Sequence, residues 1–293
     1  MQNAITHIIG VDGGGSSCRI AIAMADGRVI GRAEGPAANP TTDLNQAVES
    51  IQATLNLALQ NAGLDDTILN HACAYLGLAG VMNAQIADAV ASRFPAASVT
   101  VTDDRPTTMA GALQARAGFV AALGTGSFLG CQTAKGRRFA GGWGLVLGDQ
   151  ASGAWLGRQL LSHVLEWCEG LRPGSELLNS VFQDFHSDPS AIVSYAATAQ
   201  PKDFATFAPR ILDAADADDS TALGLMRDGA DYIQHTLDCL AFQPGDCLCL
   251  MGGLGPRYAA FIDPKYTRDL TAPLGSALDG AVRLAMDMVS SNA

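Results

Sequence analysis

Short apolar runs alternate with longer amphipathic segments along the chain, which is the pattern of an α/β protein. Apolar positions from Leu44 to Ala62 recur at helical spacing and stop at Gly63. A helix with one core-facing side is therefore expected there, with Thr42 or Asp43 as its N-cap. Apolar, β-branched runs predict strands at residues 5–11, 19–23, 28–33, 72–78 and 98–102, and a shorter periodic stretch predicts a helix at 84–94.

A second cycle of the same kind begins near residue 118. The pattern predicts strands at 119–123, 128–133 and 246–251, helices at 152–169, 222–240 and 276–289, and short surface helices in the polar stretch 170–220. A predicted strand is followed by a glycine cluster near residues 12, 124 and 252. This recurrence is a weak internal repeat of the order of elements, not of the residues themselves. The repeat predicts two α/β domains, 1–115 and 116–293, facing a shared ligand cleft, with the last helix able to pack back on the first domain.

Composition narrows the class of protein. Hydrophobic residues make up 48% of the 293 positions and charged residues 16%, which excludes a disordered chain. A net charge of −11 argues against a nucleic-acid partner. The seven cysteines are odd in number and contain no C-x-x-C, which favours reduced thiols in the cytoplasm. Neither a secretory leader nor an apolar run of membrane length is evident, so a cytoplasmic protein with no membrane partner is expected.

The most informative motif is Asp12-Gly13-Gly14-Gly15-Ser16, at the end of the first predicted strand. Bare backbone in such a turn can approach a ligand closely, and successive N–H groups make an anion-binding concavity. An aspartate beside bound phosphates requires a cation between them, which points to Mg²⁺-nucleotide chemistry. The alternative, a strained hairpin, explains the glycines but not the carboxylate.

A second turn, Gly124-Thr125-Gly126-Ser127, repeats this chemistry with two hydroxyl groups beside flexible backbone. Together the two turns resemble a two-sided clamp on a phosphate chain. The Walker A pattern, a G-x-G-x-x-G after the first strand and the zinc motif H-E-x-x-H are all absent from the sequence. A P-loop NTPase, a nicotinamide enzyme and a zinc enzyme are therefore not expected.

Two further groups carry candidate chemistry. Asp103-Asp104 follows a predicted strand, where one carboxylate could accept the proton of a substrate hydroxyl; the alternative is a helix N-cap before Pro106.

Trp143 and Asp149 lie in a glycine-rich stretch, and an aromatic face beside a carboxylate suits a sugar. The alternative for Trp143 is a place in the core.

In combination these motifs resemble a known group. The run V-D-G-G-G-S-S, the T-D-D after a strand, L-G-T-G-S, G-G-W-G-x-x-x-G-D-x-x-S-G and a late M-G-G are similar to the amino-sugar kinases of the BadF/BadG/BcrA/BcrD ATPase family. That group contains N-acetylglucosamine and glucosamine kinases. The resemblance implies two ribonuclease H-like, actin-like ATPase domains with a ligand cleft between them.

The resemblance also implies roles for individual residues. Asp12 would hold Mg²⁺ and Asp103 would act as the base that takes the proton from the 6-hydroxyl of the amino sugar. The residues expected to bind ATP and its phosphates are Gly13, Gly14, Gly15, Ser16, Thr125, Gly126, Gly252 and Gly253. Those expected to line the sugar pocket are Asn39, Gly142, Trp143 and Asp149.

Some features leave alternatives open. Many relatives have Gly-Asp-Glu-Gly where this chain has Gly148-Asp149-Gln150-Ala151. The run Ser17-Cys18-Arg19 and the pair Asp149-Gln150 resemble the bacterial glucosamine kinases more than the eukaryotic acetylglucosamine enzymes. One rival is the ATPase activator of a radical acyl-CoA dehydratase, whose iron–sulfur cluster needs cysteines in a motif absent here. Another is a non-catalytic sugar sensor on the same fold. The motifs do not select between the amino sugars, and a homodimer is the common default for assembly.

Overall fold

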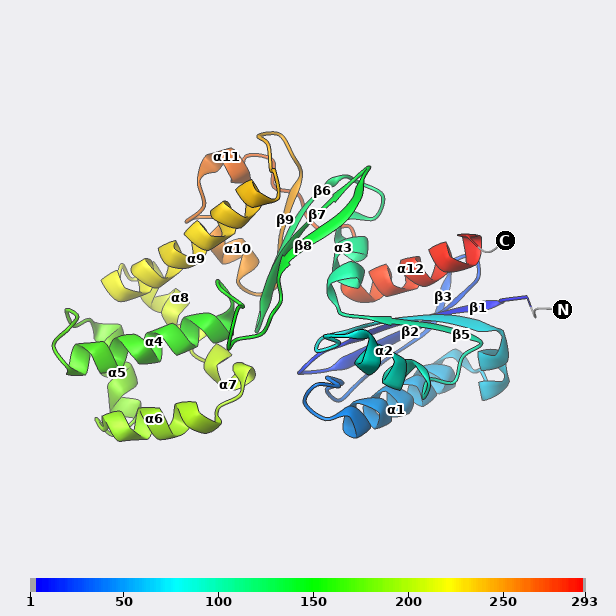
Figure 1. The fold of residues 1–293 in the computed structure, drawn as a ribbon, viewed down its shortest axis with the longest axis horizontal. Coiled ribbons are helices and arrows are strands. Elements are labelled where there is room, and N and C mark those ends of the chain that lie inside the picture. The colour runs from blue at the N-terminus through cyan, green and yellow to red at the C-terminus, as the bar shows by residue number, and fades with distance from the viewer. Residues whose placement is uncertain (1–3, 292–293) are drawn as a thin grey trace. The chain divides into compact units, whose positions relative to one another are not determined.

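The computed structural model describes residues 4–291, and contacts among them divide the chain into two units. The first unit runs to Arg116 and takes in the segment from Pro273 onward, while the second spans Ala117–Ala272. Each unit is built around its own β-sheet (Figure 1). The last helix therefore belongs with the first unit, although it follows the second in sequence.

The sheet of the first unit has five strands in the order β3-β2-β1-β4-β5. Strands β1, β2 and β3 pair antiparallel as successive hairpins, whereas β4 and β5 add parallel to β1. The bounds are β1 His7–Gly13, β2 Cys18–Met24, β3 Val29–Gly35, β4 Ala72–Leu78 and β5 Ser98–Thr102. Every residue of β4 is buried, as expected for a strand in the middle of a covered sheet.

Helices cover both faces of this sheet. Side chains alternate along β1, so that Ile9 and Val11 pack towards α1 and α2, while Ile8 packs towards α3 and α12. Figure 1 shows α1 and α12 on opposite sides of the sheet. The bounds are α1 Leu44–Ala62, the 3₁₀ helix η1 Asp66–His71, α2 Ala84–Ala91, α3 Arg105–Leu113 and α12 Ala277–Ser291.

The second unit repeats the first four strands of the first. Its sheet has the order β8-β7-β6-β9, in which β6, β7 and β8 pair antiparallel and β9 adds parallel to β6. The bounds are β6 Gly118–Leu123, β7 Ser127–Thr133, β8 Gly136–Gly141 and β9 Leu248–Met251. The turns after β1 and β6 are thus equivalent, whereas Gly252 follows the fourth strand and corresponds to the segment after β4.

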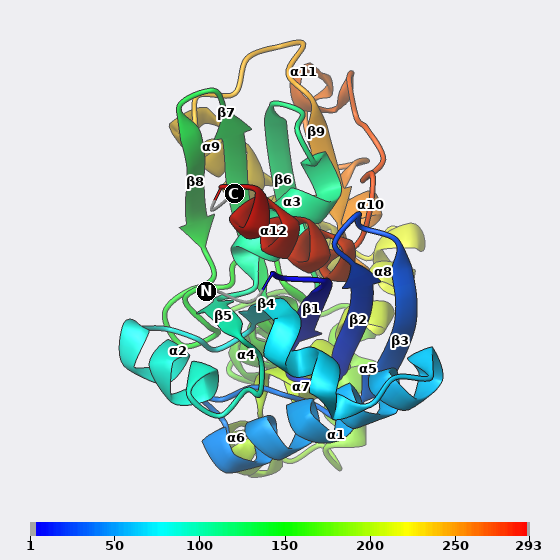
Figure 2. The same cartoon turned by 90° about the vertical axis from the view of Figure 1, so that its right-hand side faces the viewer.

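A helical layer packs on the sheet of the second unit (Figure 2). Its core combines Leu123 and Leu129 from the strands with Leu160 of α4 and Ile233 of α9. The bounds are α4 Gly153–Cys168, α5 Glu176–Asp184, α6 Pro189–Thr198, α7 Pro201–Ala205, α8 Ala208–Asp216, α9 Ser220–Cys239, α10 Gly255–Tyr258 and α11 Pro264–Thr267.

Two sequence expectations need correction. The strand β8 was not predicted, because its Gly-Arg-Arg-Phe-Ala-Gly sequence has neither an apolar run nor a clear alternation. The helices between residues 170 and 220 are short, as expected, but they are more than a surface layer. Leu178 and Ile211 are fully buried and belong to the core of the second unit.

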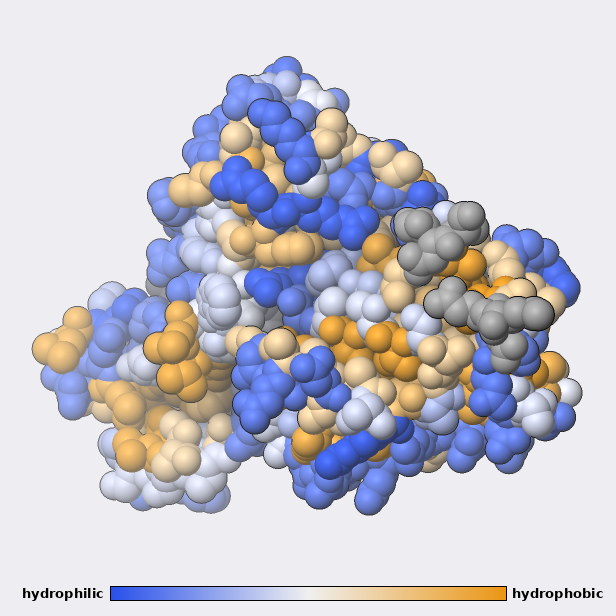
Figure 3. Space-filling view, turned by 45° about the vertical axis from the view of Figure 1, so that its right-hand side comes forward, coloured by the Kyte–Doolittle hydropathy of each residue, from blue (hydrophilic) through white to orange (hydrophobic). Residues whose placement is uncertain are grey.

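The outer surface is a mosaic of hydrophilic residues and separate apolar patches on the face drawn in Figure 3. Across residues 4–291, no helix combines the length and the apolar character needed to cross a bilayer.

The contact between α3 and α12 depends on glycine. A Cβ added at Gly280 would lie 1.9 Å from the carbonyl oxygen of Thr107 and 2.5 Å from the amide nitrogen of Gly111. Both neighbours are backbone atoms, so they cannot move aside cheaply. We expect Gly280→Ala to lower the free energy of unfolding by about 2–3 kcal/mol, as measured by chemical denaturation followed by circular dichroism.

A matched control for this substitution is Gly224→Ala in α9, where an added Cβ would meet no heavy atom within 4 Å. That change should raise stability slightly, by about 0.5–1 kcal/mol, because alanine is the better helix former. Equal unfolding midpoints for Gly280→Ala and the wild type would show that α3 and α12 are not in this close contact.

Candidate active site

In the first unit, the predicted carboxylates lie at one edge of the sheet. Strands β1, β4 and β5 are parallel, with Asp12 opposite Gly77 and Gly77 opposite Thr102. Asp103 directly follows β5, so it lies at the same edge as Asp12, with β4 between them. Carboxyl edges of parallel strands are where open α/β sheets bind ligands.

Asp12 is a buried carboxylate with a cationic partner. Its side chain is only 11% exposed and accepts a hydrogen bond from Nη2 of Arg19, which lies opposite it on β2. Burial raises the pKa of Asp12, and the nearby Arg19 guanidinium opposes that shift. Arg19 thereby helps to keep a buried carboxylate ionised, the form in which it can bind a cation.

The glycine turn after β1 is open and unstrained. None of Gly13, Gly14 and Gly15 has a positive φ, and added Cβ atoms at Gly14 and Gly15 would meet nothing within 4 Å. The turn does join the β1–β2 hairpin, but these φ values show none of the strain that the alternative supposed. The fold does not require glycine at positions 14 and 15. What glycine provides there is a backbone that no side chain covers.

Asn39 lies beside this turn. The amide N–H of Ala38 donates to the carbonyl of Gly14 at 2.9 Å, which ties the loop after β3 to the glycine turn. The Asn39 side chain accepts a hydrogen bond from the N–H of Thr41 and packs against Gly80, where an added Cβ would lie 2.2 Å from Oδ1. Asn39 is thus on the same side of the first unit as the turn and the predicted metal ligand.

Asp103 is held by Arg105. Oδ1 of Asp103 accepts hydrogen bonds from the backbone N–H of Arg105 at 3.0 Å and from its Nε at 2.8 Å, and Oδ2 accepts from Nη2 at 3.1 Å. The predicted N-cap interpretation is partly correct, because Asp104 occupies the N-cap position of α3. The Asp104 side chain, however, makes no capping hydrogen bond.

Asp104 adds a third carboxylate at this edge. Burial is the main reason that its pKa is raised to about 6, and the charges on Asp103 and Asp12 raise it further. Asp103 and Asp104 follow β5 in sequence, at the edge of the sheet where Asp12 lies near the end of β1. The start of α3 is fixed over Gly77, since an added Cβ there would lie 2.2 Å from Oγ1 of Thr107.

In the second unit, the predicted phosphate-binding turn contacts the start of α4. The N–H groups of Gly153 and Ala154 donate to the carbonyls of Gly124 and Thr125, at 2.8 and 3.2 Å. Gly252 adopts φ +77° and packs on Leu123, where an added Cβ would lie 2.3 Å from the carbonyl oxygen. The turn after β6 and the glycines after β9 are therefore adjacent.

Asp149 connects this turn to the Trp143 loop. Gly144 donates its N–H to Oδ1 of Asp149 at 3.2 Å, and an added Cβ at Gly126 would lie 2.9 Å from Oδ2. Burial raises the pKa of Asp149, while N–H groups of Gly144 and Ser127 oppose the shift. These contacts give Asp149 a structural function in joining the two loops; its predicted sugar contact stays a prediction.

The loop before Asp149 displays apolar side chains. Trp143 is 61% exposed, so its predicted alternative place in the core is wrong. Val146 and Leu147 are still more exposed. Gly142 adopts φ +78° and donates its N–H to the carbonyl of Ser127, which fixes the start of the loop.

Sequence reasoning missed Arg19 and Arg105 as partners of the two key carboxylates. A signal for Arg19 was available, because residues directly opposite each other in a hairpin share a face. For Arg105 no sequence signal was available, since the turn of the chain into α3 directs its guanidinium back to Asp103.

The residues present are compatible with Mg²⁺. Magnesium is usually held by one or two carboxylates together with substrate phosphates. Among the described residues, no three His, Cys, Asp or Glu side chains gather to hold a metal without such phosphates. Asp12, a buried carboxylate beside an open glycine turn, is the type of ligand that this arrangement requires.

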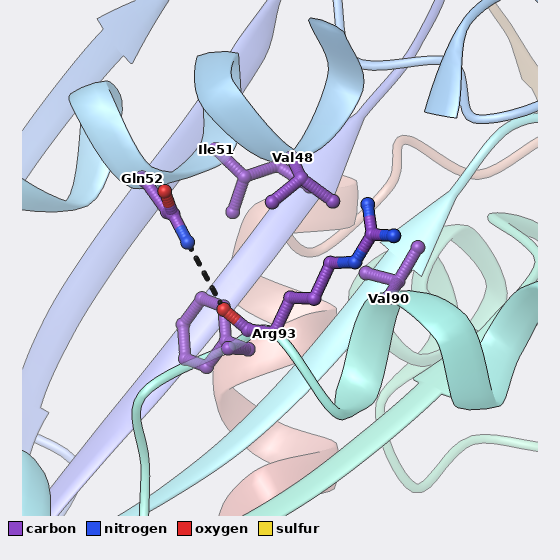
Figure 4. A pocket seen from close by; sticks show the side chains of 6 residues that line it. Val48, Ile51, Gln52, Val90 and Arg93 are labelled. Atoms are coloured by element: carbon purple, nitrogen blue, oxygen red, sulfur yellow. Dashed lines mark hydrogen bonds between the residues drawn. The ribbon is translucent and has the colours of Figure 1, made fainter. Parts of the chain in front are cut away.

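A separate hollow lies between α1 and α2 (Figure 4). It is lined mainly by apolar side chains, and Nε2 of Gln52 donates to the carbonyl of Arg93 across it at 3.1 Å. The Arg93 guanidinium is paired with Asn45. No carboxylate or glycine turn lines this hollow, so we assign it to helix packing rather than to catalysis.

Comparison with known proteins extends over nearly the whole chain. A model of the BadF/BadG/BcrA/BcrD ATPase family matches residues 9–281. Glucosamine kinase GspK of Vibrio cholerae is 30% identical over 283 residues, which cover 96% of this chain and 96% of that protein.

Solved structures agree on the fold. The crystal structure of a candidate N-acetylglucosamine kinase from Chromobacterium violaceum gives a TM-score of 0.87 at 34% identity, covering 96% of this chain and 99% of that one. A ROK family glucokinase from Streptomyces griseus, at 18% identity, gives a TM-score of 0.54 with 97% and 99% covered, and shares the fold alone. The predicted fold class is confirmed.

Proposed function

The chain belongs to the BadF/BadG/BcrA/BcrD ATPase family, and from this premise we propose that it transfers the γ-phosphoryl group of ATP to the 6-hydroxyl of an amino sugar, glucosamine or N-acetylglucosamine. The full-length similarity to a glucosamine kinase is the observation that carries this proposal. The joint placement of Asp12, the open glycine turn and Asp103 at one sheet edge supports it, because phosphoryl transfer needs a cation ligand, a phosphate cradle and a base.

The proposed reaction has a simple balance. The sugar O6 forms a bond to the γ-phosphorus as the bond from that phosphorus to the β,γ-bridging oxygen breaks, and ADP leaves. Asp103 accepts the O6 proton. When bound, Mg²⁺ would neutralise charge on the β- and γ-phosphates, and Asp12 would hold it. Most of the rate enhancement would come from positioning and from electrostatic stabilisation of the transferring group.

Further residues would bind the two substrates. The turns at Gly13–Ser16 and at Thr125 and Gly126 would donate backbone N–H groups and hydroxyls to phosphate oxygens. Gly252 and Gly253, whose bare backbone follows β9, would lie against the nucleoside. The residues proposed to bind the sugar are Asn39, Gly142, Trp143 and Asp149. Trp143 supports this assignment by its exposure, since an aromatic face available to a sugar ring must be uncovered.

The glycine turn offers a test that separates binding from folding. An added Cβ at Gly15 meets no protein atom, so Gly15→Ala should leave the unfolding midpoint unchanged. The methyl group would instead stand where phosphates approach the backbone. We expect roughly tenfold weaker ATP binding, about 1.4 kcal/mol, by isothermal titration calorimetry. Unaltered affinity would remove this turn from the nucleotide site; Gly224→Ala, at an equally open position in α9, should bind ATP normally.

The proposed function is tested by coupled ADP release with glucose, glucosamine, N-acetylglucosamine and N-acetylmannosamine as acceptors. One of the two glucosamine-type sugars should give the highest kcat/KM. Equal rates with and without any sugar would indicate an ATPase, and sugar binding without ADP release would indicate a sensor.

A further inference from the structure

Asp103 differs from Asp12 in how its arginine holds it: Asp12 accepts a hydrogen bond from Nη2 of Arg19, whereas both oxygens of Asp103 accept from one guanidinium. Nε and Nη2 of Arg105 reach one carboxylate oxygen each, at 2.8 and 3.1 Å. An unpaired aspartate carboxylate rotates broadly about χ2, whereas two parallel hydrogen bonds from a planar guanidinium define the plane of the carboxylate.

This ion pair is also more buried than the others. The side chains of Arg105 and Asp103 are 20% and 26% exposed. In each of the five other ion pairs described, at least one partner is more than 30% exposed. Exposed pairs are screened and mobile, so they orient side chains poorly. The Arg105–Asp103 pair is the one suited to hold a carboxylate in a single geometry.

The backbone that carries Arg105 is itself held in place. Arg105 is the first residue of α3, and Pro106 follows it. The first turn of the helix contacts β4 through Thr107 and Gly77, and its later turns contact α12. A group that positions a reacting atom works best when it is mounted on such a rigid element.

We propose that Arg105 is a positioning residue for phosphoryl transfer, one that orients the Asp103 carboxylate towards the acceptor hydroxyl. This inference rests on the proposed kinase function. This role requires the planar guanidinium, with its two parallel N–H donors, as well as its positive charge. A lysine ammonium would neutralise Asp103 without defining the plane of the carboxylate. Arg105 touches neither substrate in this scheme and acts only through Asp103.

The test measures kcat and both KM values for Arg105→Ala and Arg105→Lys. Misplacing a catalytic group costs up to about 100-fold in rate, so kcat should fall roughly 10- to 100-fold in both variants. KM for ATP should stay within about twofold of the wild type. Free guanidinium should restore part of the kcat of Arg105→Ala but none of that of Arg105→Lys. Arg93→Ala, which removes an exposed guanidinium paired with Asn45, should retain wild-type kinetics.

A double-mutant cycle makes the test decisive. If Arg105 acts through Asp103, removing Arg105 from an Asp103→Asn enzyme should cause no further loss of kcat. Equal losses in both backgrounds, or a kcat for Arg105→Ala within about twofold of the wild type, would overturn the proposal. If Arg105→Ala does not fold, as judged by circular dichroism, the lysine variant decides.

The same kinetic measurements test the kinase function and the role of Arg105 separately. A wild-type enzyme inactive on every amino sugar would refute the proposed function and the role of Arg105 with it. An active wild type with fully active Arg105 variants would refute only the role of Arg105.

Discussion

Replacement of Asp103 by Asn is expected to lower kcat about 10²–10⁴-fold, the range that general-base assistance supplies, while ATP affinity stays unchanged. Asparagine keeps the shape of the side chain but cannot accept the proton of the sugar hydroxyl. ATP contacts are assigned to the glycine turns, which the substitution does not touch. Steady-state kinetics and calorimetric ATP titration measure the two effects separately.

The neighbouring carboxylate provides the matched comparison. Asp104→Asn removes the same charge one residue away, from a half-buried side chain that makes no capping hydrogen bond to α3. Its kcat should stay within about tenfold of the wild type, since it lacks the orientation required of a base. The reverse order, with Asp104→Asn inactive and Asp103→Asn active, would transfer the role of base to Asp104.

The second large effect is expected at Asp12. Asp12→Asn should abolish the preference for magnesium: the wild type should bind ATP at least about tenfold more tightly with Mg²⁺ than with EDTA, and the variant about equally in both. The physical reason is that the amide lacks the charge that a divalent cation requires. Because Arg19 is half-exposed, losing its partner should cost little stability.

Asp26→Asn serves as the control, because Asp26 lies in the exposed β2–β3 turn and accepts only a local hydrogen bond from Arg28 N–H among the bonds described. It should keep the full magnesium dependence. A normal response to Mg²⁺ in Asp12→Asn would exclude Asp12 as the metal ligand.

Much of the fold follows from local sequence. Helix α1 begins after Asp43, whose side chain accepts the N–H of Gln46, and ends at Gly63 with φ +67°, both as the capping residues predicted. Strand β8 escaped prediction because strand formation there depends on pairing with β7 and not on its own residues. The sequence therefore predicts an element best where a capping residue ends a helix or where an apolar run forms a buried strand.

The sequence predicted which residues belong to the candidate site, but not all of the contacts that hold their side chains in place. The strand-end positions of Asp12 and Asp103 could be read from apolar runs. The pairing of Arg19 with Asp12 could have been inferred from the hairpin, in which the two residues lie opposite each other. The Arg105–Asp103 contact could not, because that guanidinium reaches its carboxylate through turn geometry and rotamers that the sequence leaves open. The buried position of Asp149 likewise depends on two loops meeting, which no periodicity encodes.

The most direct test of the central claim follows the γ-phosphoryl group itself. Incubation with γ-labelled ATP, Mg²⁺ and glucosamine or N-acetylglucosamine should move the label to the sugar in equal amount to the ADP formed, with phosphorus NMR placing it on O6. Label released as inorganic phosphate in the presence of either sugar, with no sugar phosphate formed, would contradict the account.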